Sequence, residues 1–452
     1  MFSAASQKVP VLEISSCQAG LSPVLSKKLC WRFAPLLVAI YMVNQMDRSN
    51  MGYASLVMNK EIHLSIAQYG TGTSLFFVGY ILCEIPSNII LSKLGARIWL
   101  SRIMISWGII SSISCLVNND KSFYITRFIL GAAEAGFFPG VMYFLTVWFP
   151  SRDRVWFATI FTMAIPASGI LSAPLSTFLM QHVSIMGLSG WRSMLFLEGI
   201  PAILLGATVF LVLPDKPERA RWLTPAEAAE IRRALCLESS QEDEIQSVSG
   251  KSALTDTRVW LIGSVYFGLN STLITILYFI PQVVNDFCNV SDNLTTLQIG
   301  LFSALPFMAS IMGMWIWGRY VRQRNFHIAF IVSPMLVSAL SLAAAPWLPS
   351  AGGIMTFLSM STTGCLCAIG TFWQLPAMMV KHDQAAALAL ITSIGVSSGI
   401  VVGSFVGAMR ETTGSYNIPF CVIAGCMGAS AFVVLFLARQ VRTPVTAATP
   451  DR

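Results

Sequence analysis

The residues of this sequence best suited to chemistry lie inside apolar segments. Asp47 and Arg48 are neighbours in the run WRFAPLLVAIYMVNQMDRSNMGYASL, and Arg127 and Glu134 are seven residues apart in RFILGAAEAGFFPG. A charge in hydrocarbon is costly, so ionisable residues in such segments line a protein interior and mark substrate, ion or proton pathways. We therefore expect these four side chains to form a functional site.

The spacing of the four residues predicts how they pair. Consecutive residues of a helix point about 100° apart, so Asp47 and Arg48 need separate partners. Arg127 and Glu134 share a helix face, and we predict that Glu134 reaches Arg48 while Arg127 reaches Asp47 or a substrate. A guanidinium binds carboxylates in a bidentate manner, so a proton on Glu134 would free Arg48 for an anion. A purely structural cluster is the alternative.

Apart from Arg102 and Arg192, which we assign to helix ends, the charged residues within the apolar segments all lie in the first half of the chain, and they are Asp47, Arg48, Glu84, Arg127, Glu134 and Glu198. Four acids and two bases carry a net charge of −2 if all are ionised, so we expect a carboxylate to be protonated in part of a reaction cycle. We assign proton coupling to Asp47 and Glu134, and structural or gating roles to Glu84 and Glu198. Gly136 and Gly140 are expected to let a neighbouring helix approach closely.

Uncharged polar and aromatic residues of the apolar segments suit recognition of a hydroxyl group or a ring. Tyr80 is placed to donate its hydroxyl to the same carboxylate as Arg48. The substrate-binding candidates are Arg48, Tyr80, Arg127, Tyr278, Gln282, Trp373, Gln374, Thr392 and Ser393, with Asn270 beside them.

The elements that position these residues are predicted to be membrane-spanning helices. Of the 452 residues 55% are hydrophobic and 11% are charged, against about 25% charged in soluble domains. A spanning helix needs about 20 apolar residues. Twelve such segments are predicted at 34–57, 69–91, 98–117, 123–148, 155–180, 192–213, 259–281, 297–318, 328–346, 352–379, 385–409 and 416–438. This is an all-α membrane protein with two pseudo-symmetric six-helix bundles.

The charged segment 214–258 is expected to divide the chain into bundles 34–213 and 259–438, with tails at 1–33 and 439–452. Lys and Arg concentrate in loops on the side of the N-terminus, which predicts that both termini and the central loop are cytoplasmic. The net charge of +7 therefore reflects topology in the lipid bilayer and indicates no nucleic-acid partner. The first 33 residues show no cleavable signal sequence.

Other chemistries find little support. Cys365-x-Cys367 lacks a second ligand pair and the four histidines map near loops, so we expect no metal and no cofactor. A phosphate-binding GxxxxGK[ST] motif and a nucleophile–base arrangement are missing from the sequence, so an enzyme is not expected. Two halves joined by a long loop are typical of secondary transporters, and we expect a monomer.

Four segments carry a resemblance to a known family. MDRSNMGYASL, FFVGYILCEIPSNIILSKLGAR, RFILGAAEAGFFPGVMYFLTVWFP and GWRSMLFLEGIPAILLG resemble the anion:cation symporter family of the major facilitator superfamily. The resemblance implies proton-coupled import of a small organic anion across the inner membrane by alternating access. The implied anion is a sugar acid, a tartrate-like acid or an aromatic acid. Asp47 and Glu134 would then couple protons, and Arg48 would bind the substrate carboxylate.

The sequence also departs from the family pattern. LSKLGARIW and WGRYVRQRNFH lack the Asp usual in the superfamily's cytoplasmic loops, which puts the usual charge-relay gate in question. ITSIGV carries Thr392 where similar transporters often have Asn, which favours a less hydroxylated or aromatic anion. A uniporter or exporter of a neutral or cationic solute and a transporter-like sensor remain open as alternatives.

Overall fold

The computed structural model describes residues 21–150, 157, 161–185, 187–246, 255–292, 295–323, 327–348, 350–380 and 384–442, and helices are the regular elements of these ranges. The main helices are α1 (Pro23–Glu61), α2 (Ile66–Leu94), α3 (Ala96–Ile113), α4 (Asp120–Glu134), α5 (Phe137–Trp148), α7 (Ala164–His182), α8 (Gly190–Val212), α9 (Pro225–Gln246), α10 (Thr257–Asp292), α11 (Thr296–Arg322), α12 (Ala329–Ala344), α13 (Ala351–Phe372), α14 (Gln374–Met379), α15 (Gln384–Thr413) and α16 (Asn417–Arg442). The predicted all-α membrane fold is confirmed.

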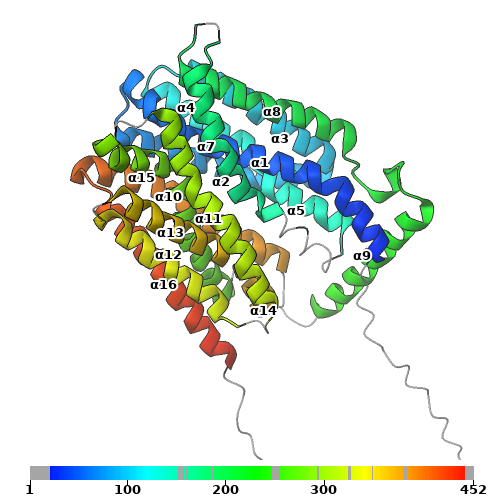
Figure 1. Cartoon of the computed structure of the whole chain (residues 1–452). Coiled ribbons are helices and arrows are strands. Elements are labelled where there is room, and N and C mark those ends of the chain that lie inside the picture. The colour runs from blue at the N-terminus through cyan, green and yellow to red at the C-terminus, as the bar shows by residue number, and fades with distance from the viewer. Residues whose placement is uncertain are drawn as a thin grey trace, which may run out of the picture.

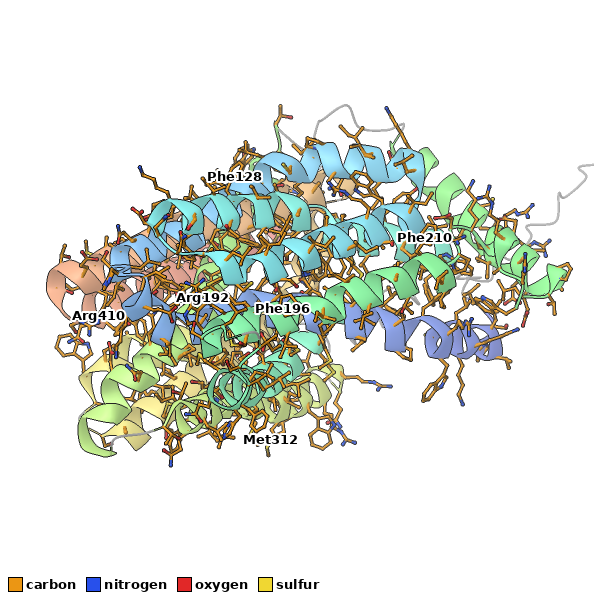
Figure 2. All side chains as sticks on the ribbon, turned by 90° about the horizontal axis from the view of Figure 1, so that it is seen from above. Phe128, Arg192, Phe196, Phe210, Met312 and Arg410 are labelled. Carbon is orange, nitrogen blue, oxygen red and sulfur yellow. The ribbon has the colours of Figure 1, made fainter. Side chains whose placement is uncertain are left out.

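The outer surface of the bundle is apolar. Eleven stretches of the described chain are long and apolar enough to cross a membrane, with α4 and α5 counted as one. Figure 2 shows Phe128, Phe196, Phe210 and Met312 on the periphery, and each is at least one-third exposed. The predicted span 155–180 lies partly outside the described residues, and its described part forms most of α7. The chain is a multi-pass membrane protein.

The helices gather in two groups, with α1–α8 on one side and α10–α16 on the other (Figure 1). Helix α2 packs along α15, and α7 packs along α11, so two long seams join the groups. Helix α9 lies beside the start of α1, and we call this end of the molecule the α9 end. The opposite end, which carries Arg192 and Arg410, is called the far end (Figure 2).

Helix α1 begins eleven residues earlier than the predicted span. Ser22 precedes the helix and Pro23 occupies its first turn, where a missing N–H costs nothing. The early turns are anchored to the loop between the groups, because Lys28 Nζ bonds Glu227 at 2.8 Å and the Arg32 guanidinium lies 5.8 Å from the Trp222 ring. Residues 23–33 of the predicted tail are thus helical, while 1–20, 247–254 and 443–452 lie outside the described residues.

The predicted helix 123–148 is broken in two, which corrects the sequence-based expectation. Gly136 has φ +84°, a conformation that glycine adopts without strain, and it separates α4 from α5. Gly136 and Gly140 therefore do not share one helix. The predicted close approach of a neighbouring helix is present at Gly140, where a Cβ would lie 2.6 Å from Leu91 Cδ1 of α2. The break makes Glu134 the last residue of α4.

Candidate functional site

The site is built around a buried ion pair between α1 and α4. Arg48 Nε and Nη2 both lie 2.5 Å from Glu134 Oε1, and the Asn44 amide donates to the same oxygen at 2.7 Å. The Glu134 side chain is fully buried, whereas 19% of the Arg48 side chain remains accessible. Glu134 Oε2 has no hydrogen-bond partner. The predicted Arg48–Glu134 contact is therefore present, and one carboxylate oxygen is left unused.

The helix break explains why Glu134 needs this pairing. The C-terminus of a helix carries partial negative charge, so a carboxylate on the last residue of α4 is disfavoured unless a cation compensates it. The backbone freed by the break is satisfied locally, because Ser87 Oγ donates to the Ala135 carbonyl at 2.8 Å. Asn44 lies one turn before Arg48, so both side chains project from the same face of α1.

Aromatic rings separate the two arginines. The Arg48 guanidinium lies 5.5 Å from the Phe76 ring and 5.2 Å from the Tyr80 ring. The Arg127 guanidinium lies 4.7 Å from the same Phe76 ring, and its Nη2 bonds the Tyr278 hydroxyl at 3.3 Å. Cation–π contacts of this kind compensate part of the lost hydration. The Arg127 Nε atom is buried and has no partner.

Asp47 faces a different neighbour from Arg48. Its Oδ1 accepts from the Ser111 hydroxyl of α3 and from the Asn50 amide at 3.4 Å, while its Oδ2 has no partner. Arg127 lies within electrostatic range of this carboxylate without a hydrogen bond to it among the described contacts. The prediction that neighbouring Asp47 and Arg48 use separate partners is confirmed.

Two further acids lie near these groups. Glu198 of α8 accepts from Ser176 Oγ at 2.7 Å, has an unpartnered Oε2, and lies within electrostatic range of Asp47. Glu84 of α2 is buried and lies within electrostatic range of Arg48. All six predicted intramembrane charges thus belong to the first group of helices.

The two groups of helices meet at the site and beyond it toward the far end. Five hydrogen bonds among the described residues join them, including Ser404 N to Ser74 Oγ at 2.8 Å and Tyr69 Oη to the Tyr278 carbonyl at 3.2 Å. Between the two arginines of the site, Arg127 is buried, whereas Arg48 keeps accessible side-chain surface.

Several predicted binding residues are engaged elsewhere. Gln282 donates to Ser55 Oγ at 2.8 Å and accepts from Tyr416, so it joins the groups rather than facing Arg48. Thr392 bonds carbonyls of its own helix, and Gln374 is exposed at the start of α14. Ser393 is half-buried in α15.

Trp373 packs in an aromatic cluster with Tyr266 and Phe372. Asn270 donates to the Gly395 carbonyl and to Ser398 Oγ, both at 3.0 Å. Asn270 and Thr392 are thus bonded within the second group, whereas Tyr278 and Gln282 bond residues of the first group.

Sequence reasoning missed Asn44, Ser111, Phe76 and Tyr266. Asn44 carries a usable signal, because a residue four positions before Arg48 shares its helix face. The other three are ordinary residues of membrane helices, and only packing brings them to the charges. Among the described residues, His, Cys, Asp and Glu form no group of three that could hold a metal ion.

Comparisons with known proteins give a consistent result. The family model described as Major Facilitator Superfamily matches residues 37–404. A "Putative tartrate transporter" of Agrobacterium vitis is 37% identical over 415 residues, covering 92% of this chain and 91% of that protein. A "Putative metabolite transport protein NicT" of Pseudomonas putida is 35% identical, covering 91% and 94%. The Escherichia coli xylose transporter XylE, in a partially occluded inward open conformation, has the same fold, with a TM-score of 0.70 at 14% identity over 93% of this chain and 100% of that one.

Proposed function

The chain belongs to the major facilitator superfamily, and from this premise we propose that it is a proton-coupled symporter that imports a small organic anion by alternating access. It is a membrane transporter of a small solute and not an enzyme, as its family and its full-length relatives are transporters. The observation that carries the proposal is the Arg48–Glu134 ion pair, which is buried and has one free carboxylate oxygen.

Organic anions are the substrate class that fits the charges of the site. Arg48 and Arg127 are the basic residues there, and a guanidinium binds a carboxylate through two parallel hydrogen bonds. Arg127 Nε has no hydrogen-bond partner among the described residues. Its N–H can therefore donate to a substrate carboxylate without breaking an existing hydrogen bond. The relative named as a tartrate transporter supports this class.

Coupling follows from competition for Arg48. A proton added to Glu134 Oε2 neutralises the carboxylate and weakens the ion pair, so the guanidinium can turn to the substrate. When the anion leaves, Glu134 loses its proton and captures Arg48 again. Asp47, with its own free oxygen, provides a second proton site one residue away.

The proposed setting is the inner membrane, with the α9 end, both termini and the central loop in the cytoplasm. In this orientation the hydrogen bonds that join α2 to α15 lie toward the outer side. We further propose a functional monomer and the division into bundles 34–213 and 259–438; the gathering of the helices in two groups supports that division (Figure 1).

Uptake by purified protein in liposomes tests the proposal. An inward proton gradient should drive accumulation of a carboxylate from a panel of tartrate, gluconate, benzoate and phenylacetate, but not of neutral xylose. Arg48→Gln should abolish uptake, whereas Arg192→Gln, at a surface pair with Glu61, should retain it. Glu134→Gln should keep exchange of labelled for unlabelled anion and lose proton-driven accumulation. Normal accumulation by Glu134→Gln would refute its coupling role.

A further inference from the structure

We propose that α2 and α15 form a latch at the far end, in which Glu411 of α15 caps the first turn of α2 and holds the two groups of helices together. This inference rests on the alternating access of the proposed function and concerns neither the solute nor the coupling ion. It comes from contacts between the groups that the site at Arg48 does not use.

The latch is centred on a hydrogen bond between the two groups. The backbone N–H of Ala67, in the first turn of α2, donates to Glu411 Oε2 at 2.8 Å. The Glu411 carboxylate also interacts with the hydroxyl of Ser65, the residue that precedes α2. Figure 2 shows the neighbouring Arg410 at the far end, so these contacts lie at the end of the molecule opposite α9.

Among the described contacts, the first turn of α2 is completed by a residue of the other group. The first N–H groups of a helix have no acceptor within the helix. The Ser65 hydroxyl accepts from Gln68 N at 3.2 Å, and the Ser65 carbonyl accepts from Tyr69 N at 3.0 Å. Ala67 N instead bonds Glu411, and a carboxylate is favoured at the positive end of a helix. Separation of the groups would leave this N–H to water.

The end of α15 that carries Glu411 is held within its own group. The preceding residue, Arg410, bonds Asp286 Oδ2 of α10 at 2.8 Å, and its guanidinium lies 5.0 Å from the Tyr416 ring. Adjacent residues of α15 thus contact different groups, Arg410 the second and Glu411 the first. Because this helix end is a fixed part of the second group, the Ala67–Glu411 bond depends on how the two groups meet.

Glycines bring the two helix backbones into contact along the rest of the seam. Three of them, Gly399, Gly403 and Gly407, are four residues apart, so they share one face of α15. A Cβ on Gly403 would lie 2.7 Å from the Gly70 carbonyl oxygen of α2, and one on Gly407 would lie 2.6 Å from the Ile66 carbonyl oxygen. Both distances are shorter than real Cβ contacts, so the seam closes because these side chains are missing.

The latch suits a contact that opens and closes during transport. Glu411 is exposed, so water can take over its hydrogen bond when the groups separate. A buried ion pair in the same place would resist opening more strongly. In the proposed orientation the far end faces the outside, so the latch closes the side from which the solute enters. We expect it to favour the closed state by about two- to fivefold, the effect of one carboxylate at a helix N-terminus.

Thiol labelling of the purified full-length protein in detergent, without solute or pH gradient, tests the latch. Ser74→Cys places a thiol in the seam, at a position that is 4% exposed and two turns from Ala67. Glu411→Gln should raise its rate of labelling by a water-soluble maleimide about two- to fivefold, measured by mass spectrometry of the labelled peptide. A cap that only completes α2 would leave this rate unchanged. The native Cys115, buried in the first group, reports general loosening and should label slowly throughout.

Two matched comparisons use other positions of the chain. Glu61→Gln changes an exposed glutamate that bonds Arg192 within the first group, and it should leave the labelling of Ser74→Cys unchanged. Gly407→Ala keeps every charge but adds a Cβ against α2, so it should raise the labelling rate. Gly428→Ala, where a Cβ meets open space, should not.

The outcomes separate this inference from the proposed function. Labelling of Ser74→Cys that Glu411→Gln leaves unchanged, or that rises in step with Cys115 or equally with Glu61→Gln, would overturn the latch. Faster labelling in Glu411→Gln without proton-driven uptake of any carboxylate in liposomes would support the latch and refute the symport. Proton-driven uptake together with unchanged labelling would refute the latch alone.

Discussion

The strength of the Arg48–Glu134 pair can be measured by removing each charge alone and then both together. Arg48→Gln leaves Glu134 with Asn44 as its one remaining partner, in a position with no accessible surface. Glu134→Gln leaves a guanidinium in contact with two aromatic rings and no counter-charge at bonding distance. The double variant has two neutral amides that can bond each other.

The structure sets the expected size of the effect. Removing one partner of a buried ion pair costs about 3–5 kcal/mol. Since 19% of the Arg48 side chain is accessible, the lower limit of about 3 kcal/mol applies to each single variant. The double variant leaves no unpaired charge, so it should cost no more than a single variant, about 3 kcal/mol rather than the sum of about 6. The coupling free energy is then at least about 3 kcal/mol, at the upper end of the range for residues in contact.

Equilibrium unfolding in mixed micelles of detergent and lipid at pH 7, followed by circular dichroism, gives the four free energies of unfolding. The matched control is the same cycle at Arg232 and Glu218, an Arg–Glu pair of 3.1 Å with 61% and 43% of the side chains accessible. Solvent weakens such pairs, so its coupling should stay below about 1 kcal/mol.

A coupling free energy at Arg48 and Glu134 that is no larger than the control value would refute this reasoning. It would mean that water or lipid headgroups reach the pair freely, and the competition between the Glu134 carboxylate and the substrate anion for Arg48 would lose its basis.

Two further predictions concern the elements around the site. Gly136→Ala should lower the thermal stability and reduce transport, because a left-handed residue with a side chain costs about 1–2 kcal/mol and its Cβ would lie 2.8 Å from Ser87 Cβ. Gly425→Ala, where a Cβ meets open space, is the control, and equal stability losses in the two would contradict the account. The Lys28 ammonium, with its hydrogen bonds, holds the pKa of Glu227 below its usual 4.5, so the contact between α9 and α1 should persist above pH 4.5 and weaken as the pH falls further. The protection of α9 amides from hydrogen exchange, taken relative to the intrinsic exchange rate at each pH, should then fall on acidification, and Glu227→Gln should show low protection at every pH. Protection in α9 that changes neither with pH nor in Glu227→Gln would contradict this.

The charge cluster was predictable because hydrocarbon leaves few arrangements for ionised groups. Arg48 must find a carboxylate, and the alternatives inside the apolar segments were few. The spacing of Arg127 and Glu134 then selected one helix face, and the structure places Glu134 on Arg48. The all-helical fold was predictable for a related reason. The hydrocarbon interior holds no water to bond backbone groups, so these groups must bond within their own segment, as they do in a helix.

The sequence contains a signal for the helix break at Gly136 that hydropathy does not detect. EAGFFPG places a glycine after the acid and Pro139 in the first turn of the next helix, a combination that ends one helix and starts another. The apolar character of the whole segment masked this signal. Hydropathy reports how apolar a segment is, and it does not change when one residue adopts a positive φ.

The second group of helices was least predictable. Ser and Thr in membrane helices bond their own backbone, so the type of Thr392 says little about its role. Tyr266 and Phe372 are far apart in sequence, and their contact depends on how α10 and α13 pack. Gly395 indicates that contact only after the structure shows which ring it accommodates.

Proton uptake on substrate binding tests most directly the central claim that the Glu134 carboxylate and the anion compete for Arg48, so that Glu134 takes up a proton when the anion binds. The purified protein is mixed in weakly buffered solution near pH 7 with the carboxylate of the panel that binds best, and the pH change is recorded. The account predicts about one proton taken up for each anion bound by the native chain and a markedly smaller uptake by Glu134→Gln. Binding of the anion by the native chain with no proton uptake at any pH between 5 and 9 would contradict it.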